Sequence, residues 1–230
     1  MVFDKGFVME VLELKQETLS LYDLKLIPVL EHHFSFQPGQ YAYLSTPSGK
    51  KGCFAIASEP EEKNFIQFLI KNQNEGVSHE LCRLKGNDQL RVSVPFGAAY
   101  PIERMKGKNV LLIGIGSALA PLRSLIKSMM RKNQFFGKIV FLYGARKTQD
   151  IPYQNDFRLW SEKFDVRLAV SQLDRPFPKA VEGRVTDLVS NLLIESDFVA
   201  CVCGTRIMEE EVVKLLETKG ISKQNIFFNY

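Results

Sequence analysis

The sequence lacks the features that mark several large classes of protein. No apolar run in its 230 residues approaches the roughly 20 residues that a membrane-spanning helix requires. The N-terminal stretch mixes acidic residues with alternating apolar ones and has no charged-then-apolar order of the signal-peptide kind. We therefore expect no membrane span and no secretory leader.

Cysteine and histidine are also scarce, with four and three residues respectively. Cys201 and Cys203 are two positions apart on what reads as one strand, whereas Cys53 and Cys82 lie far away in the sequence. This spacing neither suggests a disulfide framework nor provides the close-spaced cysteines of an iron–sulfur cluster. We expect no metal site, and a cytoplasmic location is the simplest interpretation.

Long runs of like charge are missing too. The formal net charge is only +4, and the basic residues are scattered along the chain. Binding to nucleic acid normally needs a clustered basic patch, so we expect no nucleic-acid partner. A weakly basic surface would still attract an acidic protein partner.

What the first half does contain is an apolar pattern of period two, clearest over residues 7–14 and 19–26. Such alternation is typical of half-buried strands. Turn residues such as Pro38-Gly39 and Ser48-Gly49 separate the segments. Six short strands at this spacing, with one helix over residues 77–84, predict a small antiparallel β-barrel. The other four strands are expected at residues 40–44, 53–57, 65–70 and 89–94.

After Met105 the pattern changes to strands that alternate with helices. This order predicts a parallel sheet with helices on both faces. The fold class is therefore a two-domain α+β chain, with an antiparallel β-barrel over residues 1–104 and an α/β domain over residues 105–230. The expected strands are 110–113, 139–143, 166–170, 199–202 and 226–228, and the expected helices are 122–131, 153–163, 184–193 and 207–219.

One stretch, Lys108–Pro121 (KNVLLIGIGSALAP), joins a buried strand, a loop of small residues and the start of a helix. Backbone N–H groups at such a junction can hold a phosphate. The loop alone is a weak signal, because the third glycine of G-x-G-x-x-G is missing. Ligands of parallel sheets bind beyond the carboxyl ends of the strands. Small or polar residues follow four of the expected strands there: Gly114 to Ser117, Gly144 to Arg146, Ser171-Gln172 and Gly204-Thr205.

Short motifs along the whole chain resemble, in order, those of the plant-type ferredoxin–NADP reductase superfamily of FAD-dependent oxidoreductases. Within it, the chain is most similar to uncharacterised FAD/NAD(P)-binding oxidoreductases related to plastid proteins. Taken singly, the motifs PGQY, FAIAS and GVS are also typical of a turn, a core strand and a helix N-cap, respectively. The matching pieces are PGQY at 38–41, FAIAS at 54–58, GVS at 76–78, PFG at 95–97, GIGSALAP at 114–121, YGAR at 143–146, Cys203-Gly204 with Met208, and the terminal Tyr230.

The resemblance implies that FAD binds the barrel. Phe54 would stack on the flavin, and the main chain of Ala55 and Ile56 would hold the ring edge. Two positions depart from the family pattern: Gly52 replaces an arginine that contacts the pyrophosphate, and Ala55 replaces a serine or threonine. The remaining flavin-side residues that the resemblance implies are Tyr41, Ser58, Leu69, Ile70, Lys71, Gly76, Val77 and Ser78.

The resemblance also implies that a nicotinamide dinucleotide binds the second domain. Gly114, Gly116 and Ser117 would cradle its pyrophosphate, although Ala118 replaces a usual glycine. NADPH-using relatives often have an arginine where this chain has Gln172, which favours NADH, although Arg146 or Arg175 could compensate. The other implied cofactor residues are Pro121, Gly144, Ser171, Gly204, Thr205 and Met208.

The function that follows is transfer of a hydride from NAD(P)H to FAD, and of electrons onward to a small ferredoxin-like or flavodoxin-like protein. Cys203, near the nicotinamide, and Tyr230, over the flavin, are the candidate catalytic residues. Their alternative roles are a buried core cysteine and an aromatic at a strand end. None of His32, His33 and His79 has a partner that makes a catalytic case. Two alternative functions are a flavin-binding electron-transfer subunit of a larger redox complex and a non-catalytic module that kept the fold.

Overall fold

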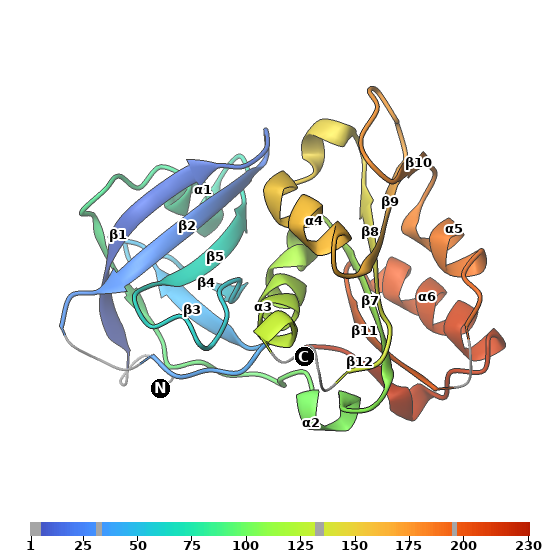
Figure 1. The fold of residues 1–230 in the computed structure, drawn as a ribbon. Helices are drawn as coiled ribbons and strands as arrows, with labels where there is room; N and C mark the ends of the chain where they lie inside the picture. The colour runs from blue at the N-terminus through green and yellow to red at the C-terminus, as the bar shows by residue number, and fades with distance from the viewer. Residues whose placement is uncertain (1–5, 31–33, 132–135, 195–196) are drawn as a thin grey trace.

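The computed structural model describes residues 6–30, 34–131, 136–194 and 197–230, which form two sheets lying side by side (Figure 1). His32 and His33 lie outside the described residues, so the expectation that they have no catalytic partner stays a prediction.

The first sheet is entirely antiparallel, with the strand order β4-β3-β6-β1-β2-β5. An isolated bridge between Ile56 and Phe68 joins its two edges, so the sheet curls into a half-barrel. The alternation along β1 gives the curled sheet an apolar inner face, because Met9 and Val11 are buried inside whereas Val8 and Leu12 face outward. The predicted antiparallel barrel is confirmed. Its elements are β1 (Phe7–Gln16), β2 (Leu21–Pro28), β3 (Tyr41–Ser45), β4 (Lys51–Ala55), β5 (Ile66–Lys71), α1 (Gly76–Leu81) and β6 (Gln89–Val92).

The second sheet is parallel, with the strand order β10-β9-β8-β7-β11-β12. The predicted alternation of strands and helices is confirmed, and the predicted boundary after residue 104 falls inside the short helix α2 (Ile102–Met105). The strands are β7 (Asn109–Ile115), β8 (Ile139–Ala145), β9 (Asp165–Val170), β10 (Ala180–Glu182), β11 (Phe198–Cys203) and β12 (Ile226–Phe227). The longer helices are α3 (Leu119–Arg131), α4 (Gln154–Ser161), α5 (Val185–Ser190) and α6 (Arg206–Thr218).

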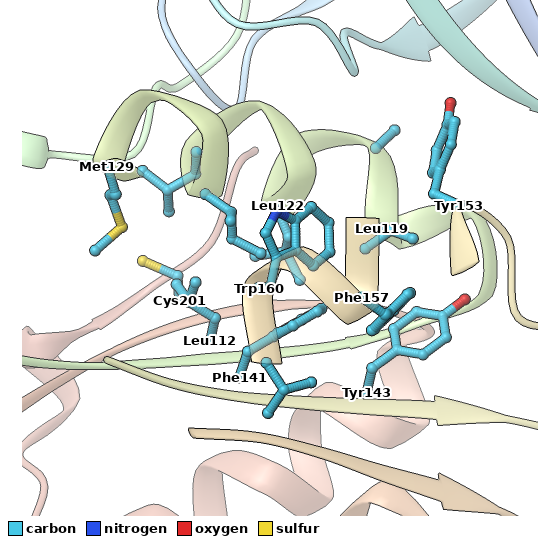
Figure 2. Packing of buried hydrophobic residues seen from close by; sticks show 14 of the residues in the cluster. Leu112, Leu119, Leu122, Met129, Phe141, Tyr143, Tyr153, Phe157, Trp160 and Cys201 are labelled. Atoms are coloured by element: carbon cyan, nitrogen blue, oxygen red, sulfur yellow. The ribbon is translucent and has the colours of Figure 1, made fainter. Parts of the chain in front are cut away.

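Helices cover both faces of the second sheet, as its continuous apolar strands require. Leu112 and Phe141 pack with α3 and α4, whereas Leu111 and Leu142 pack with α5 and α6. Figure 2 shows the first of these layers, in which Phe141 stacks on Phe157 with ring centroids 5.6 Å apart. The two layers bury the strands of the sheet on both faces.

The half-barrel packs against α3. Leu21, Ala57 and Leu69 of the half-barrel belong to the same buried cluster as Leu119 and Leu122 of α3. The two sheets are therefore joined by an apolar interface, and α3 is the helix that lies between them (Figure 1).

Strand order reverses at β7, because β8 lies on one side of it and β11 on the other. In doubly wound sheets, ligands bind beyond the carboxyl ends of the strands at such a switch point. Gly114 and Cys203 are paired in register there, so the loops after β7 and β11 leave the sheet side by side.

Candidate cofactor site

The loop after β7 is a single 3₁₀ turn, Gly116–Ala118, that leads directly into α3. Gly116 has φ +54°, a left-handed conformation that glycine adopts easily, and a methyl group there would meet nothing within 4 Å. The hydroxyl of buried Tyr143 donates a hydrogen bond of 3.0 Å to the carbonyl oxygen of Gly116. The loop is therefore supported by β8 on one side, and its other side is open.

Above this loop lies a cavity of about 730 Å³ between the two sheets. The half-barrel contributes the β1–β2 turn at Leu19 and the end of β5 at Lys71. A cavity of this size, lined from two domains, suits a dinucleotide. The sequence-predicted residues that line it are Lys71, Gly116, Ser117, Gly144, Arg146, Ser171, Gly204, Thr205 and Met208.

Three predicted dinucleotide residues do not line this cavity. Gly114 is buried inside β7, where a methyl group would lie 2.5 Å from Leu122 Cδ1. Pro121 is buried in the first turn of α3, a position that proline tolerates. Gln172 is exposed beyond β9, where its backbone N–H donates to the carbonyl oxygen of Arg146.

Sequence reasoning missed the contribution of Arg184, Val185 and Thr186, which line the cavity at the start of α5. They follow β10, a strand of only three residues that carries no readable periodicity. The signal that could have found them is the turn at Gly183, since a glycine before a helix start marks a further loop at the same rim.

A second cavity of about 840 Å³ meets the first at Gly204, which lines both. Tyr41 of the half-barrel, Cys203 at the end of β11, and Tyr230 at the C-terminus line it together. The structure thus brings the two predicted catalytic residues beside one predicted flavin residue, although they are far apart in the sequence.

Glu209 in α6 holds the residues around Gly204 in place, and this role was not predicted from the sequence. One carboxylate oxygen accepts a hydrogen bond of 2.8 Å from the Gly204 N–H, and the other accepts one of 2.8 Å from the Tyr230 hydroxyl. Burial, and then the bond to Glu209, raises the pKa of Tyr230 to about 12. Burial, with the nearby Glu209 charge, also raises the pKa of the Cys203 thiol to about 12. Cys203 is therefore a neutral thiol at pH 7, suited to packing against a ring and not to nucleophilic attack.

The predicted flavin strand presents a half-buried surface at Phe54 and Ala55. A methyl group at Gly52 would lie 2.5 Å from Val77 Cγ1 and 2.9 Å from Phe54 Cε2. The absence of the family's arginine therefore fits its surroundings here, since Phe54 and Val77 fill the space that a side chain at position 52 would occupy.

Four predicted flavin residues, Ile56, Ser58, Leu69 and Ile70, are instead buried in the half-barrel. The Ser58 hydroxyl oxygen accepts a hydrogen bond from the Gln67 N–H and is fully enclosed. In α1, Ser78 is buried, while Gly76 and Val77 stay half-buried.

The residues present fit both cofactors. Gly76 has φ +85° and open space where a side chain would start, which leaves the beginning of α1 accessible. Asn229 lines the second cavity, and among the described residues its side-chain oxygen has no hydrogen-bond partner although it is buried. A bound group would satisfy this acceptor.

Two family models match the chain, and together they span most of it. The oxidoreductase FAD-binding domain matches residues 10–100, and the oxidoreductase NAD-binding domain matches residues 112–214. The chain belongs to the ferredoxin reductase superfamily. The two models make it an FAD-dependent oxidoreductase that uses a nicotinamide dinucleotide, as the resemblance predicted. The finer likeness to plastid-related members of the superfamily stays a prediction.

Individual relatives agree with this membership. The sulfhydrogenase 1 subunit gamma of Pyrococcus furiosus is 28% identical over 205 residues, which cover 87% of this chain and 70% of the relative. The reductase component of propane 2-monooxygenase from Rhodococcus jostii is 28% identical over 232 residues, covering 95% and 62% respectively. A ferredoxin NADP+ reductase from Neisseria gonorrhoeae, solved with bound FAD and NADP, superimposes with a TM-score of 0.85 at 16% identity and covers 97% of this chain and 98% of its own.

Within the residues that the structure describes, no helix is both long enough and apolar enough to cross a membrane.

Proposed function

We propose that this ferredoxin reductase relative uses NADH to reduce FAD and then passes electrons to a small iron–sulfur or ferredoxin-like protein. The observation that carries the proposal is the meeting of two cavities at Gly204. One is built around the phosphate-type loop, and the other joins Tyr41 to Cys203 and Tyr230. Bound FAD would supply the acceptor for a hydride and the donor of electrons to the next protein.

The chain's own residues would bind and orient the two cofactors. The free N–H groups around Gly116 and Ser117, at the start of α3, would hold the pyrophosphate of the dinucleotide. The neutral Cys203 thiol would pack beside the nicotinamide without solvating it. Tyr230, held by its hydrogen bond to Glu209, would lie over the flavin at the second cavity. Phe54 and the start of α1 would hold FAD against the half-barrel.

The preference for NADH rests on Gln172, which supplies no positive charge for a 2′-phosphate. A second candidate, NADPH, is favoured by Arg146 and Arg184, which both line the first cavity. Comparing kcat/KM for the two nucleotides decides between them. If NADPH is the donor, R146Q and R184Q should each lower kcat/KM for NADPH far more than for NADH.

The proposed acceptor follows from the relatives, one of which is by name the reductase component of a monooxygenase. Another is by name a subunit of a sulfhydrogenase, which supports the alternative that this chain is the flavin-binding subunit of a larger redox complex. A cytoplasmic location belongs to the same proposal.

Anaerobic titration of the purified protein tests these functions. A yellow protein that one nucleotide bleaches supports the first, whereas bleaching only in the presence of another subunit supports the second. A colourless protein that does not take up added FAD would refute both.

A further inference from the structure

Arg123 lies in the second turn of α3, the helix that follows the phosphate-type loop, and it is only 6% exposed. Its Nη1 donates hydrogen bonds of 2.9 Å both to the carbonyl oxygen of Ala57 and to Oε1 of Gln67. Its Nε donates to Oδ2 of Asp156 at 2.7 Å. Ala57 and Gln67 belong to the half-barrel, whereas Asp156 is in α4. A single buried side chain therefore bonds to both domains.

These contacts continue into a closed ring across the interface. Gln67 Nε2 donates to Oδ2 of Asp23 at 2.6 Å, and the Tyr153 hydroxyl donates to the other oxygen of Asp23 at 2.8 Å. The ring closes where the Arg123 guanidinium lies 4.2 Å from the centre of the Tyr153 ring. All four residues are buried. A buried polar network whose members are satisfied rigidifies its surroundings.

Tyr153 shows that the chain accepts local strain to make these contacts. Its φ of +51° lies in the left-handed region, which residues other than glycine rarely adopt. In this conformation its N–H donates to Oε2 of Glu17 in the half-barrel at 2.9 Å, while its hydroxyl reaches Asp23. Figure 2 shows the Tyr153 hydroxyl pointing away from Phe157 and Tyr143.

The hydrogen bond between Arg123 and the Ala57 carbonyl lies next to both halves of the cofactor site. Ala57 directly follows the predicted flavin residues Phe54 to Ile56, and its N–H donates to the carbonyl oxygen of Gln67 at 2.7 Å. Arg123 sits one turn into the helix that starts at the phosphate-type loop. Apolar side chains at an interface can slide, but a planar guanidinium bonded to three fixed acceptors cannot.

We propose that Arg123 is a positioning residue that fixes the phosphate-type loop of the second domain relative to the flavin strand of the first. The proposal rests on the proposed function, because it concerns the alignment of the two cofactors. It assigns Arg123 no contact with either cofactor.

The same helix provides a matched control. Arg131, two turns further along α3, donates to both carboxylate oxygens of Glu59 in the connection after the flavin strand, at 2.7 and 2.9 Å. It also links the two domains, but its side chain is 56% exposed. Glu59 itself is buried, but an ion pair whose guanidinium lies in solvent holds a geometry more weakly than the enclosed contacts of Arg123.

The test compares R123M with R131M by hydrogen exchange of the Ala57 and Gln67 amides, by FAD content and by anaerobic rapid mixing with the nucleotide. We expect R123M to accelerate exchange at both amides while FAD content stays equal to that of the wild type. The rate of flavin reduction at saturating nucleotide should fall about tenfold or more, because small misplacements of reacting groups are costly, while the Kd for the nucleotide changes little. R131M should match the wild type in all three measurements, and R123K should recover part of the rate.

Unchanged hydrogen exchange at the Ala57 and Gln67 amides of R123M would overturn the proposal. It would also be overturned if R123M were less stable than the wild type but reduced its flavin at the wild-type rate. Loss of FAD would overturn it too, because it would place Arg123 in the flavin site. If R123M does not fold, Q67L removes one of the two hydrogen bonds from Arg123 to the half-barrel and should give the same pattern with smaller changes. If neither nucleotide reduces the wild type, the proposed function fails, and hydrogen exchange still decides whether Arg123 fixes the interface.

Discussion

Replacing Glu209 tests whether its carboxylate holds the corner where the two cavities meet. Glu209 is 6% exposed, and its two oxygens accept hydrogen bonds from the Gly204 N–H and the Tyr230 hydroxyl, each 2.8 Å long. Hydrogen bonds to a charged group contribute about 1.5–3 kcal/mol and neutral ones about 0.5–1.5 kcal/mol. Glutamine keeps an oxygen for Gly204 and can donate its amide to Tyr230, so each bond should weaken by about 1 kcal/mol.

The net effect of E209Q on stability should be smaller than the sum of these losses, because burying a neutral amide costs less than burying a carboxylate. E209A removes both bonds and leaves a part-buried N–H unpaired, which costs about 2 kcal/mol. For a chain of this length, that loss lowers the Tm by about 4–8 °C. Thermal unfolding should therefore rank the wild type above E209Q, and E209Q above E209A.

A second measurement isolates the charge. E209Q should lower the pKa of Tyr230 from about 12 toward its ordinary value of 10, although burial, the larger cause, will keep it raised. Ultraviolet titration of tyrosinate measures this, with Y230F as the control that identifies the signal among seven tyrosines. A Tyr230 titration that does not change in E209Q would refute the reasoning, since it would mean that the carboxylate does not act on the phenol.

Four further substitutions test the site and the interface. Cys203→Ala should slow reduction of FAD by the nucleotide in rapid mixing while the absorption spectrum shows full FAD content, and loss of flavin would contradict its placement. Tyr230→Ser should lower the Kd for the nucleotide in a fluorescence titration, and an unchanged Kd would favour a simple strand-end aromatic. Gly144→Ala would place a methyl group 2.9 Å from a neighbouring isoleucine, so calorimetry should show a loss of about 1–3 kcal/mol. The bond to Arg131 holds the pKa of Glu59 below its usual value of 4.5, so urea unfolding should show wild type more stable than E59Q above about pH 4.5, with the difference vanishing as the pH falls through the lowered pKa.

The sequence predicted the two sheets well because their strands carry strong, distinct patterns. Alternation in β1 and continuous apolar runs in β7 and β8 each leave one arrangement that buries them. The elements that were missed, α2 and β10, have four and three residues. Such short elements span fewer than two repeats of their own period, too few for a pattern to be recognised.

The site was predictable in its loops and not in its cross-domain contacts. Small residues at the ends of the strands located Gly116, Gly144 and Gly204 on one rim. Arg123, by contrast, lies 66 residues from Ala57 and 33 from Asp156, and nothing local distinguishes it from a solvated arginine on a helix. Its role depends on how the two domains meet, and no periodicity of the sequence encodes that arrangement.

The imperfect glycine pattern of the phosphate-type loop has a physical explanation in this structure. In G-x-G-x-x-G, the glycines allow the tight turn, the approach of the ligand, and close packing of helix on strand. Here Gly114 provides the close packing, because Leu122 of α3 lies 2.5 Å from the place of its absent methyl group. Gly116 provides the turn through its positive φ, and the space above it is open to the cavity. Gly114 and Gly116 thus meet the pattern's requirements, so the position of the third glycine is free to hold Leu119, which is buried at the start of α3.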